Sequence, residues 1–504
     1  MPNVPIGEIL SVGMFFAICI VLMIGYPIAF TLAGTSLAFG AIGYMLGAFD
    51  LGIFGAIGLR YFGSMMSETL VAVPLFVFMG MILERSGIAD QLLTTMGRLF
   101  GSLRGGLGYS VVIVGALLAA STGVVGATVV TMGLISLPAM MRAGYDNRLS
   151  TGVICTSATL AQIIPPSTVL ILIGDILQGV NQQAQLRMGN FAPDTVSAGE
   201  LFAGALIPGL ILVGIYLLWM VYKAVFEPET CPPLVMTDAE RRSLWKDVVV
   251  ALVPATALIV AVLGSILTGV ATPTESGSIG SLGALLLAAM RRKLNLGVIW
   301  HAAKNTAVTT SMIFVILLGA SVFSLVFRGL GGEHLVEEAL RDMPGGALGA
   351  MLVVMAVMFV LGFFLDTFEI IFIVLPICGP TLIMLGLDPL WIGVMIGMNL
   401  QTSFLTPPFG FTLFYMRGVA PPAIRTSDIW MGSIPWTFLQ TFGLALVWFF
   451  PATATWLPST LFDSPPAAVR TDGGSNLQDM LDNMTAPDDD GTGGELNPFA
   501  KPSN

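Results

Sequence analysis

The sequence predicts an all-α polytopic membrane protein with two structural repeats, each containing a re-entrant helical hairpin. Three observations predict this fold class. Hydrophobic residues make up 55% of the chain and charged residues only 10%, whereas about 25% of the residues of a soluble globular protein are charged. Apolar runs follow one another along most of the chain, and several are too short to cross a bilayer. The two halves also carry similar motifs in the same order.

The composition excludes several classes of function. The 504-residue chain has a net charge of −10, which argues against nucleic-acid binding, because that function needs a basic patch. The four cysteines lie far apart without a CxxC motif, so we expect neither a disulfide framework nor a zinc site. The HExxH, Walker, GxGxxG and GxSxG motifs are absent. We therefore expect no catalytic residue and no cofactor.

The last segment, residues 461–504, differs from the rest of the chain. From Leu461 onward eight acidic residues stand against Arg470 and Lys501 alone, which accounts for −6 of the net charge of −10. The segment is rich in Pro, Gly and Asp, and it has too few apolar residues to offset the entropy lost on ordering. The sequence predicts an acidic, disordered tail.

The predicted membrane segments begin with Gly7–Pro27, which lacks a basic n-region and is too long for a signal peptide, so we expect an uncleaved helix. Short runs broken by Gly or Pro are tolerated in a membrane only where the backbone is buried in protein or lines a cavity. Such runs predict hairpins and broken helices. The further segments are Ile28–Leu46, Val71–Leu83, Val111–Ala120, Gly152–Ile164, Thr168–Val180, Leu201–Tyr222, Val248–Val270, Ile279–Met290, Thr306–Val326, Leu348–Leu365, Ile370–Leu387, Trp391–Leu405, Gly410–Met416 and Ile429–Phe450.

The polar loops give an orientation. Lys223–Lys246 carries four basic residues and Arg291–Lys293 carries three, so the positive-inside rule places both in the cytoplasm. Gln178–Glu200 is polar with a single basic residue, Arg187. We expect it on the outer face.

A repeat relates the two halves. LISLPAMMRAGYD and QIIPPSTVLIL in the first half resemble FIVLPICGPTLIMLGLD and FLTPPFGFTLF in the second. Gly144 pairs with Gly386, Asp146 with Asp388, and Pro165-Pro166 with Pro407-Pro408, each at an offset of 242. Chance recurrence is the alternative, but three pairs in one register argue against it. Such repeats are typical of secondary transporters, in which discontinuous helices of the two halves meet near the membrane midplane.

The Pro-Pro pairs carry candidate ion-binding chemistry. Each pair breaks a helix, because proline has no N–H and clashes with the preceding turn. The freed carbonyls need a partner, and Na⁺ fits them, with the hydroxyls of Ser167, Thr168 and Thr406 completing the shell. A structural kink satisfied by neighbouring helices is the alternative.

Each of the repeated stretches contains a Leu-Pro pair, Leu137-Pro138 in the first half and Leu375-Pro376 in the second. A second paired element precedes each of these pairs and has the pattern of a hairpin tip. In the first half it contains Ser121, Thr122 and Gly123, which could instead serve only helix packing. In the second half it contains Asp366, Thr367 and Glu369. An acidic residue within an apolar run usually faces the bundle interior or a cavity. The alternatives, which are compatible with ion binding, are an N-cap at Asp366 and a capping role for Glu369.

At these residues the sequence resembles the large membrane subunit of TRAP (tripartite ATP-independent periplasmic) transporters, over about residues 7 to 455. The matching stretches are VPLFVFMGMILERSG, STGVVGATVVTMG, GYD, IIPPS and LFAGALIPG in the first half, and TPTESGSIGSLGALL, LDTFEIIFIVLP, LGLDPLWIGVM and TPPFGFTLF in the second. The resemblance implies inverted repeats of the ion-transporter superfamily, with a scaffold and an elevator transport domain. It further implies Na⁺-coupled uptake of a small organic acid across the bacterial inner membrane.

The resemblance also implies partners, domains and site residues. The partners are a separate small four-helix membrane subunit and a periplasmic substrate-binding protein. Substrate is expected between the hairpin tips, near Ser121, Thr122, Asp366 and Thr367. The implied Na⁺ ligands are Ser121, Thr122, Gly123, Pro165, Ser167, Asp366, Thr367, Asn399, Thr406 and Pro407. The expected domains are scaffold helices (1–65), a first repeat with a hairpin and a Pro-Pro broken helix (66–200), scaffold helices with a cytoplasmic loop (201–300), a similar second repeat (301–425), a C-terminal helix (426–460) and the tail (461–504).

Three other functions compete with this interpretation. A stand-alone ion-coupled organic anion carrier of the same superfamily would transport without partners. An intramembrane enzyme would need a catalytic pair, but Asp366 has no obvious acidic partner except Glu369, and Lys304 has no motif serine. A channel would give no reason for paired Pro-Pro breaks.

Overall fold

The computed structural model describes residues 6–462, apart from residues 124, 192, 194 and 235–237. The described residues form helices and loops without strands, which confirms the all-helical class. The predicted tail from residue 463 onward lies outside the described residues. The helices are α1 (Ile6–Met23), α2 (Ile28–Met45), η1 (Leu51–Gly55), α3 (Ala56–Met65), α4 (Glu68–Arg85), α5 (Ile88–Gly101), α6 (Gly106–Thr122), α7 (Val125–Arg142), α8 (Asn147–Thr159), η2 (Leu160–Gln162), α9 (Thr168–Arg187), α10 (Ala198–Phe226), η3 (Pro228–Thr230), α11 (Asp238–Leu267), α12 (Pro273–Met290), α13 (Leu296–Gly329), α14 (Gly332–Arg341), α15 (Gly346–Leu361), α16 (Thr367–Met384), α17 (Pro389–Leu405), α18 (Phe411–Val419), α19 (Thr426–Phe449) and α20 (Ala452–Leu461).

Several of these helices are able to cross a membrane. Seven described helices are long and apolar enough, and the number rises to nine if two bent pairs each count as one span. The shorter apolar helices α6 and α15 are each followed along the chain by a second helix, α7 or α16, against which they pack. This is the arrangement expected of the two predicted hairpins.

Parts of the sequence-based assignment were wrong. The polar segment Gln178–Glu200 was predicted as a loop, but α9 continues to Arg187, where polar side chains of the last turns bond to other helices. Likewise, α10 continues to Phe226 and α11 begins at Asp238 within the predicted loop Lys223–Lys246. The single helix predicted over residues 426–460 is α19 and α20, with a bend of 59°. Helices α3, α5 and α14 were not predicted, because their polar residues interrupt the apolar pattern.

The two halves follow the same order of elements. Helices α5 to α9 in the first half correspond to α14 to α18 in the second. At the offset of 242, Asp146 Oδ1 accepts a hydrogen bond from the backbone N of Leu149 (3.0 Å), and Asp388 Oδ1 accepts one from the backbone N of Trp391 (2.9 Å). Gly144 and Gly386, which end the preceding turns, have φ of +81° and +93°, a region that favours glycine. The offset of 242 that relates the two halves in the sequence therefore also relates equivalent N-caps and glycine turns in the structure.

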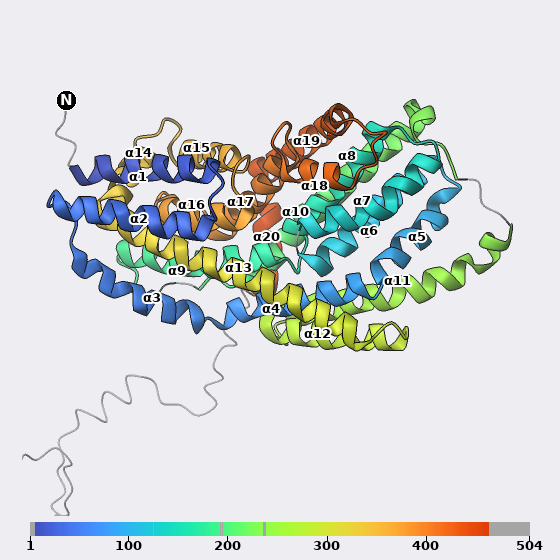
Figure 1. The fold of residues 1–504 in the computed structure, drawn as a ribbon, viewed down its shortest axis with the longest axis horizontal. Coiled ribbons are helices and arrows are strands. Elements are labelled where there is room, and N and C mark those ends of the chain that lie inside the picture. Colours follow the sequence, from blue (N-terminus) through green and yellow to red (C-terminus); the bar gives the residue numbers. More distant parts are fainter. Residues whose placement is uncertain (1–5, 124, 192, 194, 235–237, 463–504) are drawn as a thin grey trace, which may run out of the picture. The chain divides into compact units, whose positions relative to one another are not determined.

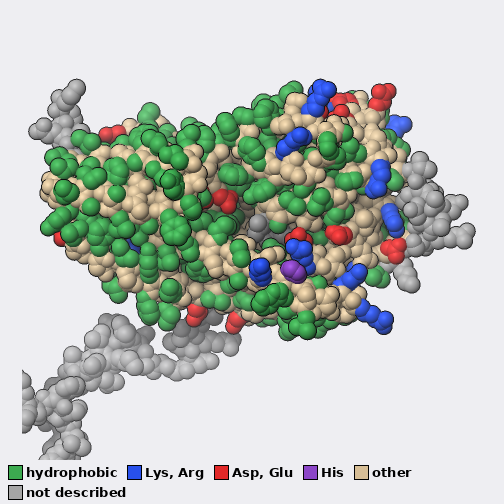
Figure 2. Space-filling view, viewed as in Figure 1, with side chains coloured by type: hydrophobic (Ala, Val, Ile, Leu, Met, Phe, Trp, Pro, Cys, Tyr) green, Lys and Arg blue, Asp and Glu red, His purple; other side chains and the backbone are tan. Residues whose placement is uncertain are grey.

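Figure 1 shows how the helices are arranged. Helices α5, α6 and α7 lie toward one end of the view, and α14, α15 and α16 lie toward the other. On the face shown in Figure 2, Lys and Arg gather on the side where α5, α8 and α11 lie, whereas the opposite end is mainly hydrophobic. This charge distribution agrees with the predicted cytoplasmic side.

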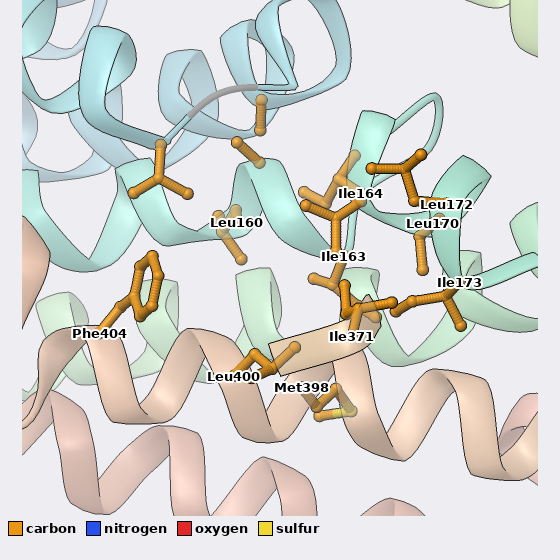
Figure 3. Packing of buried hydrophobic residues seen from close by; sticks show 14 of the residues in the cluster. Leu160, Ile163, Ile164, Leu170, Leu172, Ile173, Ile371, Met398, Leu400 and Phe404 are labelled. Carbon is orange, nitrogen blue, oxygen red and sulfur yellow. The ribbon is translucent and has the colours of Figure 1, made fainter. Parts of the chain in front are cut away.

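The first Pro-Pro break lies within the buried core. Ile163 beside the break is fully buried, as are Leu170 of α9, Ile371 of α16 and Leu400 of α17. Figure 3 shows side chains from these helices converging on the segment between α8 and α9. Because close-packed interiors resist displacement, this packing fixes the position of the polar groups in the break.

Candidate functional site

The two Pro-Pro breaks leave equivalent carbonyls without a helical partner. Both Pro-Pro bonds, Pro165-Pro166 and Pro407-Pro408, are cis. The carbonyl of Gln162, three residues before the first pair, accepts a hydrogen bond from Ser167 Oγ at 3.2 Å. The carbonyl of Phe404, three residues before the second pair, accepts one from Thr412 Oγ1 at 2.6 Å. In both halves a hydroxyl beyond the break satisfies the carbonyl before it.

The tip of the first hairpin contacts the helix that follows the first break. Gly123 ends α6 with φ of +60°, and its carbonyl accepts a hydrogen bond from Thr168 Oγ1 at 2.8 Å. A Cβ at Gly123 would lie 3.0 Å from Thr168 Cγ2, so the approach needs glycine. Ser121 and Thr122 belong to the last turn of α6, but their side chains lie outside what the structure describes. Their predicted role stays a prediction.

The tip of the second hairpin is an acidic N-cap. Asp366 precedes α16, and its Oδ1 accepts a hydrogen bond from the backbone N of Thr367 at 2.7 Å. In return Glu369 Oε2 accepts one from the backbone N of Asp366 at 3.0 Å, which completes a capping box. The capping alternative is therefore confirmed for both residues. None of the ion pairs among the described residues involves either carboxyl group.

Gln162 connects the two halves. Its Nε2 donates to Thr367 Oγ1 at 2.9 Å, and the two residues are 1% and 2% exposed. Its Oε1 is buried and has no hydrogen-bond partner among the described residues. A buried acceptor without a partner is costly unless something else meets it. We call the connected set the junction site, and it consists of Gly123, Gln162, Pro165, Ser167, Thr168, Asp366, Thr367 and Glu369.

The remaining predicted ligands lie at the second break and do not bond to the junction site. Asn399 Nδ2 donates to the carbonyl of Met355 at 2.8 Å, which ties α17 to α15. Thr406 Oγ1, directly before Pro407, donates to the carbonyl of Thr402 at 2.8 Å within the same helix. Hydrogen bonds thus connect Ser167 through Gln162 to Thr367, whereas those of Asn399 and Thr406 go to other residues.

A cavity gives access to the acidic tip. It has a volume of about 710 Å³ and lies between the start of α2, the middle of α13 and the tip residues Asp366 and Glu369. Its other described lining residues, among them Phe30 and Val315, carry no charge. Two carboxylates facing an otherwise uncharged cavity favour the binding of a cation.

The chemistry available at the junction site is oxygen ligation. No group of three or more His, Cys, Asp or Glu side chains that could hold a metal ion occurs in the part of the chain that the structure describes. An ion there would depend on carbonyl, hydroxyl, amide and single carboxylate oxygens. Broken helices commonly coordinate Na⁺ in this way.

Sequence reasoning missed Gln162 and Thr412. Gln162 is a polar residue within an apolar run, three positions before the first Pro-Pro pair, and that position is the signal that could have found it. Its counterpart at the offset of 242 is Phe404, so a search for matched polar pairs would overlook it. Thr412 lies five residues after Pro407, within the quoted stretch TPPFGFTLF, but its role could not be inferred because it is not adjacent to the Pro-Pro pair.

Comparison with known proteins identifies relatives along nearly the whole chain. Residues 14–453 match the family described as "Tripartite ATP-independent periplasmic transporter, DctM component". The C4-dicarboxylate TRAP transporter large permease protein DctM of Rhodobacter capsulatus is 28% identical over 466 residues, which cover 90% of this chain and 100% of that protein. The ectoine TRAP transporter large permease protein TeaC of Halomonas elongata is 27% identical over 446 residues, which cover 88% of this chain and 97% of that protein.

The fold is also similar to that of a solved transporter. The crystal structure of the YdaH transporter of Alcanivorax borkumensis matches with a TM-score of 0.58 and covers 90% of this chain and 98% of that one. The sequence identity is 13%. At this identity the match shows a shared membrane-transporter fold and carries no information about substrate.

Proposed function

This chain belongs to the DctM component family of tripartite ATP-independent periplasmic transporters, and we propose that it couples inward movement of Na⁺ to uptake of a small organic acid. Members of this family are large permease subunits, and the apolar helices fit a multi-pass protein of the bacterial inner membrane. Two relatives are named for C4-dicarboxylates and ectoine. A small carboxylate is the substrate class that these names share.

The observation that carries the Na⁺ proposal is the buried Oε1 of Gln162 beside the acidic hairpin tip. This oxygen has no hydrogen-bond partner among the described residues. The amide of the same side chain bonds Thr367, whose neighbour Asp366 pairs with no described basic group. An uncompensated acceptor and a carboxylate near one broken helix form an environment that a small cation would satisfy. We propose that the cation is also coordinated by oxygen atoms of Gly123, Ser167, Asp366 and Thr367.

An elevator movement follows as the proposed mechanism. Hydrogen bonds tie the first hairpin tip to α9 and the first break to the second hairpin tip. These elements would therefore move together as one transport domain. Helices α2 and α13, which line the cavity beside Asp366, would belong to the static scaffold. Bound Na⁺ would order the junction site and so permit the movement when substrate is present.

Uptake into proteoliposomes tests the function. The vesicles would contain this chain, the small membrane subunit encoded with it and the ligand-loaded binding protein. We expect accumulation that requires an inward Na⁺ gradient and falls to background when either partner is omitted. Equal uptake driven by a proton gradient in Na⁺-free buffer would contradict Na⁺ coupling.

The stand-alone carrier is the second candidate. Reconstitution of this chain alone separates the two candidates. Substrate accumulation by the single chain would establish the stand-alone carrier, whereas background uptake that recovers on adding both partners would establish the tripartite transporter.

A further inference from the structure

A second cavity, with a volume of about 460 Å³, lies between α3, α9, α13 and α16. None of its lining residues belongs to the junction site. Its lining is partly polar and includes the side chains of Arg60, Arg328, Asp175 and Gln183. The last turns of α9, which line one side of it, lead toward the segment at residues 188–197 that the charge pattern places on the outer face.

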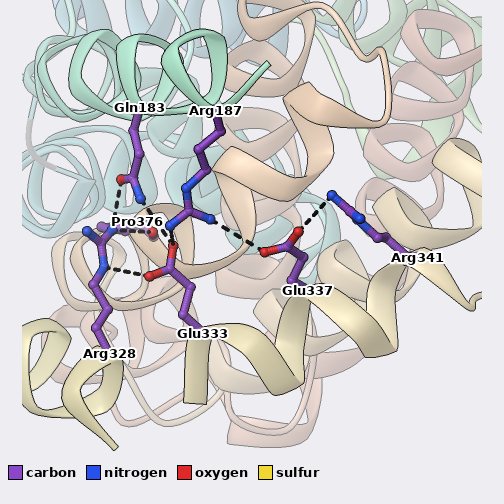
Figure 4. Close-up of polar contacts among 7 residues, drawn as sticks. All are labelled: Gln183, Arg187, Arg328, Glu333, Glu337, Arg341 and Pro376. Atoms are coloured by element: carbon purple, nitrogen blue, oxygen red, sulfur yellow. Dashed lines mark hydrogen bonds and ion pairs between the residues drawn. The ribbon is translucent and has the colours of Figure 1, made fainter. Parts of the chain in front are cut away.

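One side of the cavity is bounded by a network of charged side chains, shown in Figure 4. Glu333 of α14 lies 2.8 Å from Arg187 Nη2 and 3.2 Å from Arg328 Nε, and it accepts a hydrogen bond from Gln183 Nε2 at 3.1 Å. Arg328 Nη2 also donates to Gln183 Oε1 at 3.0 Å and to the carbonyl of Pro376 at 3.3 Å. One carboxylate therefore serves two guanidinium groups, and Arg328 is held in a fixed position facing the cavity.

Arg60 adds a positive charge to the cavity that forms no direct ion pair with a described residue. It lies on α3, is half-buried and lines the cavity. None of the hydrogen bonds or ion pairs found among the described residues involves its guanidinium group. A partly buried cation without a direct partner loses solvation, and here the only compensating attraction among the described acidic groups is from Glu333, which forms no ion pair with Arg60. Its retention at a cavity wall is explained if an anion meets it there.

Asp175, the acidic residue of the lining, does not form an ion pair with Arg60. Its Oδ1 accepts a hydrogen bond from Ser67 Oγ at 2.7 Å, and it forms no ion pair with a described basic residue. Asp175 and Ser67 therefore give the lining a second polar group besides the two arginines. A ligand with a carboxylate and a hydroxyl or amino group could use both groups.

We infer that this cavity is a second binding site, in which Arg60 and Arg328 receive a carboxylate group of the organic acid before it reaches the junction site. The inference rests on the proposed function for the direction of travel, but the binding itself does not depend on transport. Arg60 favours a carboxylate because its paired N–H donors match the two carboxylate oxygens. Arg328, whose Nε and Nη2 already contact Glu333, Gln183 and Pro376, adds positive charge beside it. The volume of about 460 Å³ is ample for a small organic acid.

Arg60 is the residue to change, because Arg328 also holds Glu333 and the carbonyl of Pro376. The full chain in lipid nanodiscs would be titrated with succinate at constant ionic strength, and the thermal midpoint would report binding. We expect succinate to raise the midpoint of the wild type. Arg60→Gln should bind succinate at least tenfold more weakly, and Arg60→Lys should show an intermediate loss, because lysine keeps the charge but not the paired donors.

Two matched controls make the result specific. Arg142→Gln removes the same charge from an exposed position on α7, away from the cavity, and should bind succinate as the wild type does. Succinamide, the neutral analogue of the same length, should leave the wild-type midpoint unchanged. Sulfate should stabilise the wild type less than succinate. This control distinguishes a site that prefers a carboxylate from one that binds any oxyanion.

Three outcomes would overturn the inference: no effect of succinate on the wild type, an equal effect on Arg60→Gln, or equal stabilisation by succinamide or sulfate. Without ligand, Arg60→Gln should unfold at the wild-type temperature or above, since it removes an unpaired cation, and so a folding defect would not obscure the result. The measurement uses neither transport partners nor a Na⁺ gradient. Its failure would therefore leave the proposed uptake function intact, and a failure of uptake would leave the binding result intact.

Discussion

Gln162 and Thr367 lie 205 positions apart in the sequence and are joined by a hydrogen bond of 2.9 Å between Nε2 and Oγ1. The bond links the helix break of the first half to the hairpin tip of the second. Both side chains are buried, so water cannot readily replace either partner. Neither element can shift without the other unless this bond is broken, and the coupling of the two halves therefore depends on it.

The first prediction concerns this bond. Gln162→Leu keeps most of the side-chain volume but removes the donor to Thr367 and the buried Oε1. We expect it to lower Na⁺-driven uptake at least tenfold and to destabilise the protein by about 1 kcal/mol, because Thr367 loses its buried partner. The control is Gln401→Leu, since Gln401 is 1% exposed and neither its Oε1 nor its Nε2 has a partner among the described residues. That variant should be neutral or stabilised. Equal effects of both substitutions would contradict a specific role for Gln162.

The second prediction concerns the close approach at the first hairpin tip. Gly123→Ala would meet two penalties, a left-handed φ of +60° and a contact with Thr168 at 3.0 Å. Gly47→Ala is the matched control, because its φ of +69° is similar but no atom lies within 4 Å of the added Cβ. We expect the control to cost about 1 kcal/mol from backbone strain alone and to transport normally. Gly123→Ala should cost more and abolish uptake. Normal uptake by Gly123→Ala would show that the tip can separate from α9 without loss of function.

The fold was predictable from the sequence wherever the apolar pattern is strong. The repeat at an offset of 242 correctly located equivalent helix starts at Asp146 and Asp388, because N-caps and glycine turns are local signals. The amphipathic helices α5 and α14 were not predicted, since their charged residues lie on one face and interrupt the run. The extension of α9 to Arg187 was not predicted either, because its polar residues are satisfied by Glu333 of a distant helix.

The candidate site was predictable only in part. The hairpin tips and Pro-Pro breaks were located from proline chemistry and from an acidic residue in an apolar run. The sequence did not indicate which of them meet. The link from Gln162 to Thr367 depends on how α16 packs against α9, and that is a tertiary property. Arg60 could not be identified from the sequence for the same reason, since only the structure shows whether an arginine forms an ion pair.

The third prediction separates the two roles of Asp366. As an N-cap it should be replaceable by Asn, which caps a helix about as well as Asp, whereas Ala removes the cap at a cost of about 1 kcal/mol. Asp388, which caps α17 through Trp391, serves as the control. If the Asp366 carboxylate also holds Na⁺, Asp366→Asn should raise the half-saturating Na⁺ concentration at least tenfold, and Asp388→Asn should leave it unchanged. Uptake measured against Na⁺ concentration decides this, and an unaltered Na⁺ dependence in Asp366→Asn would remove the carboxylate from the ion site.

The last prediction concerns Glu333, the carboxylate that Arg187 and Arg328 share. Its side chain is 13% exposed, and so the pair with Arg328 is screened less than a surface ion pair. Glu333→Gln leaves two neighbouring cations without their common anion, which should destabilise the protein by about 3 kcal/mol and lower its thermal midpoint by several degrees.

Glu338→Gln is the matched control, because Glu338 is exposed on the same helix and forms none of the ion pairs found among the described residues. Its midpoint should stay within about 1 °C of the wild type, since surface charges contribute little. Added salt should partly rescue Glu333→Gln, because counterions screen the repulsion that remains between the two guanidinium groups. If both variants unfold at the same temperature, the network does not hold α9, α13 and α14 together. The fixed position of Arg328 at the cavity that it lines with Arg60 must then come from helix packing alone.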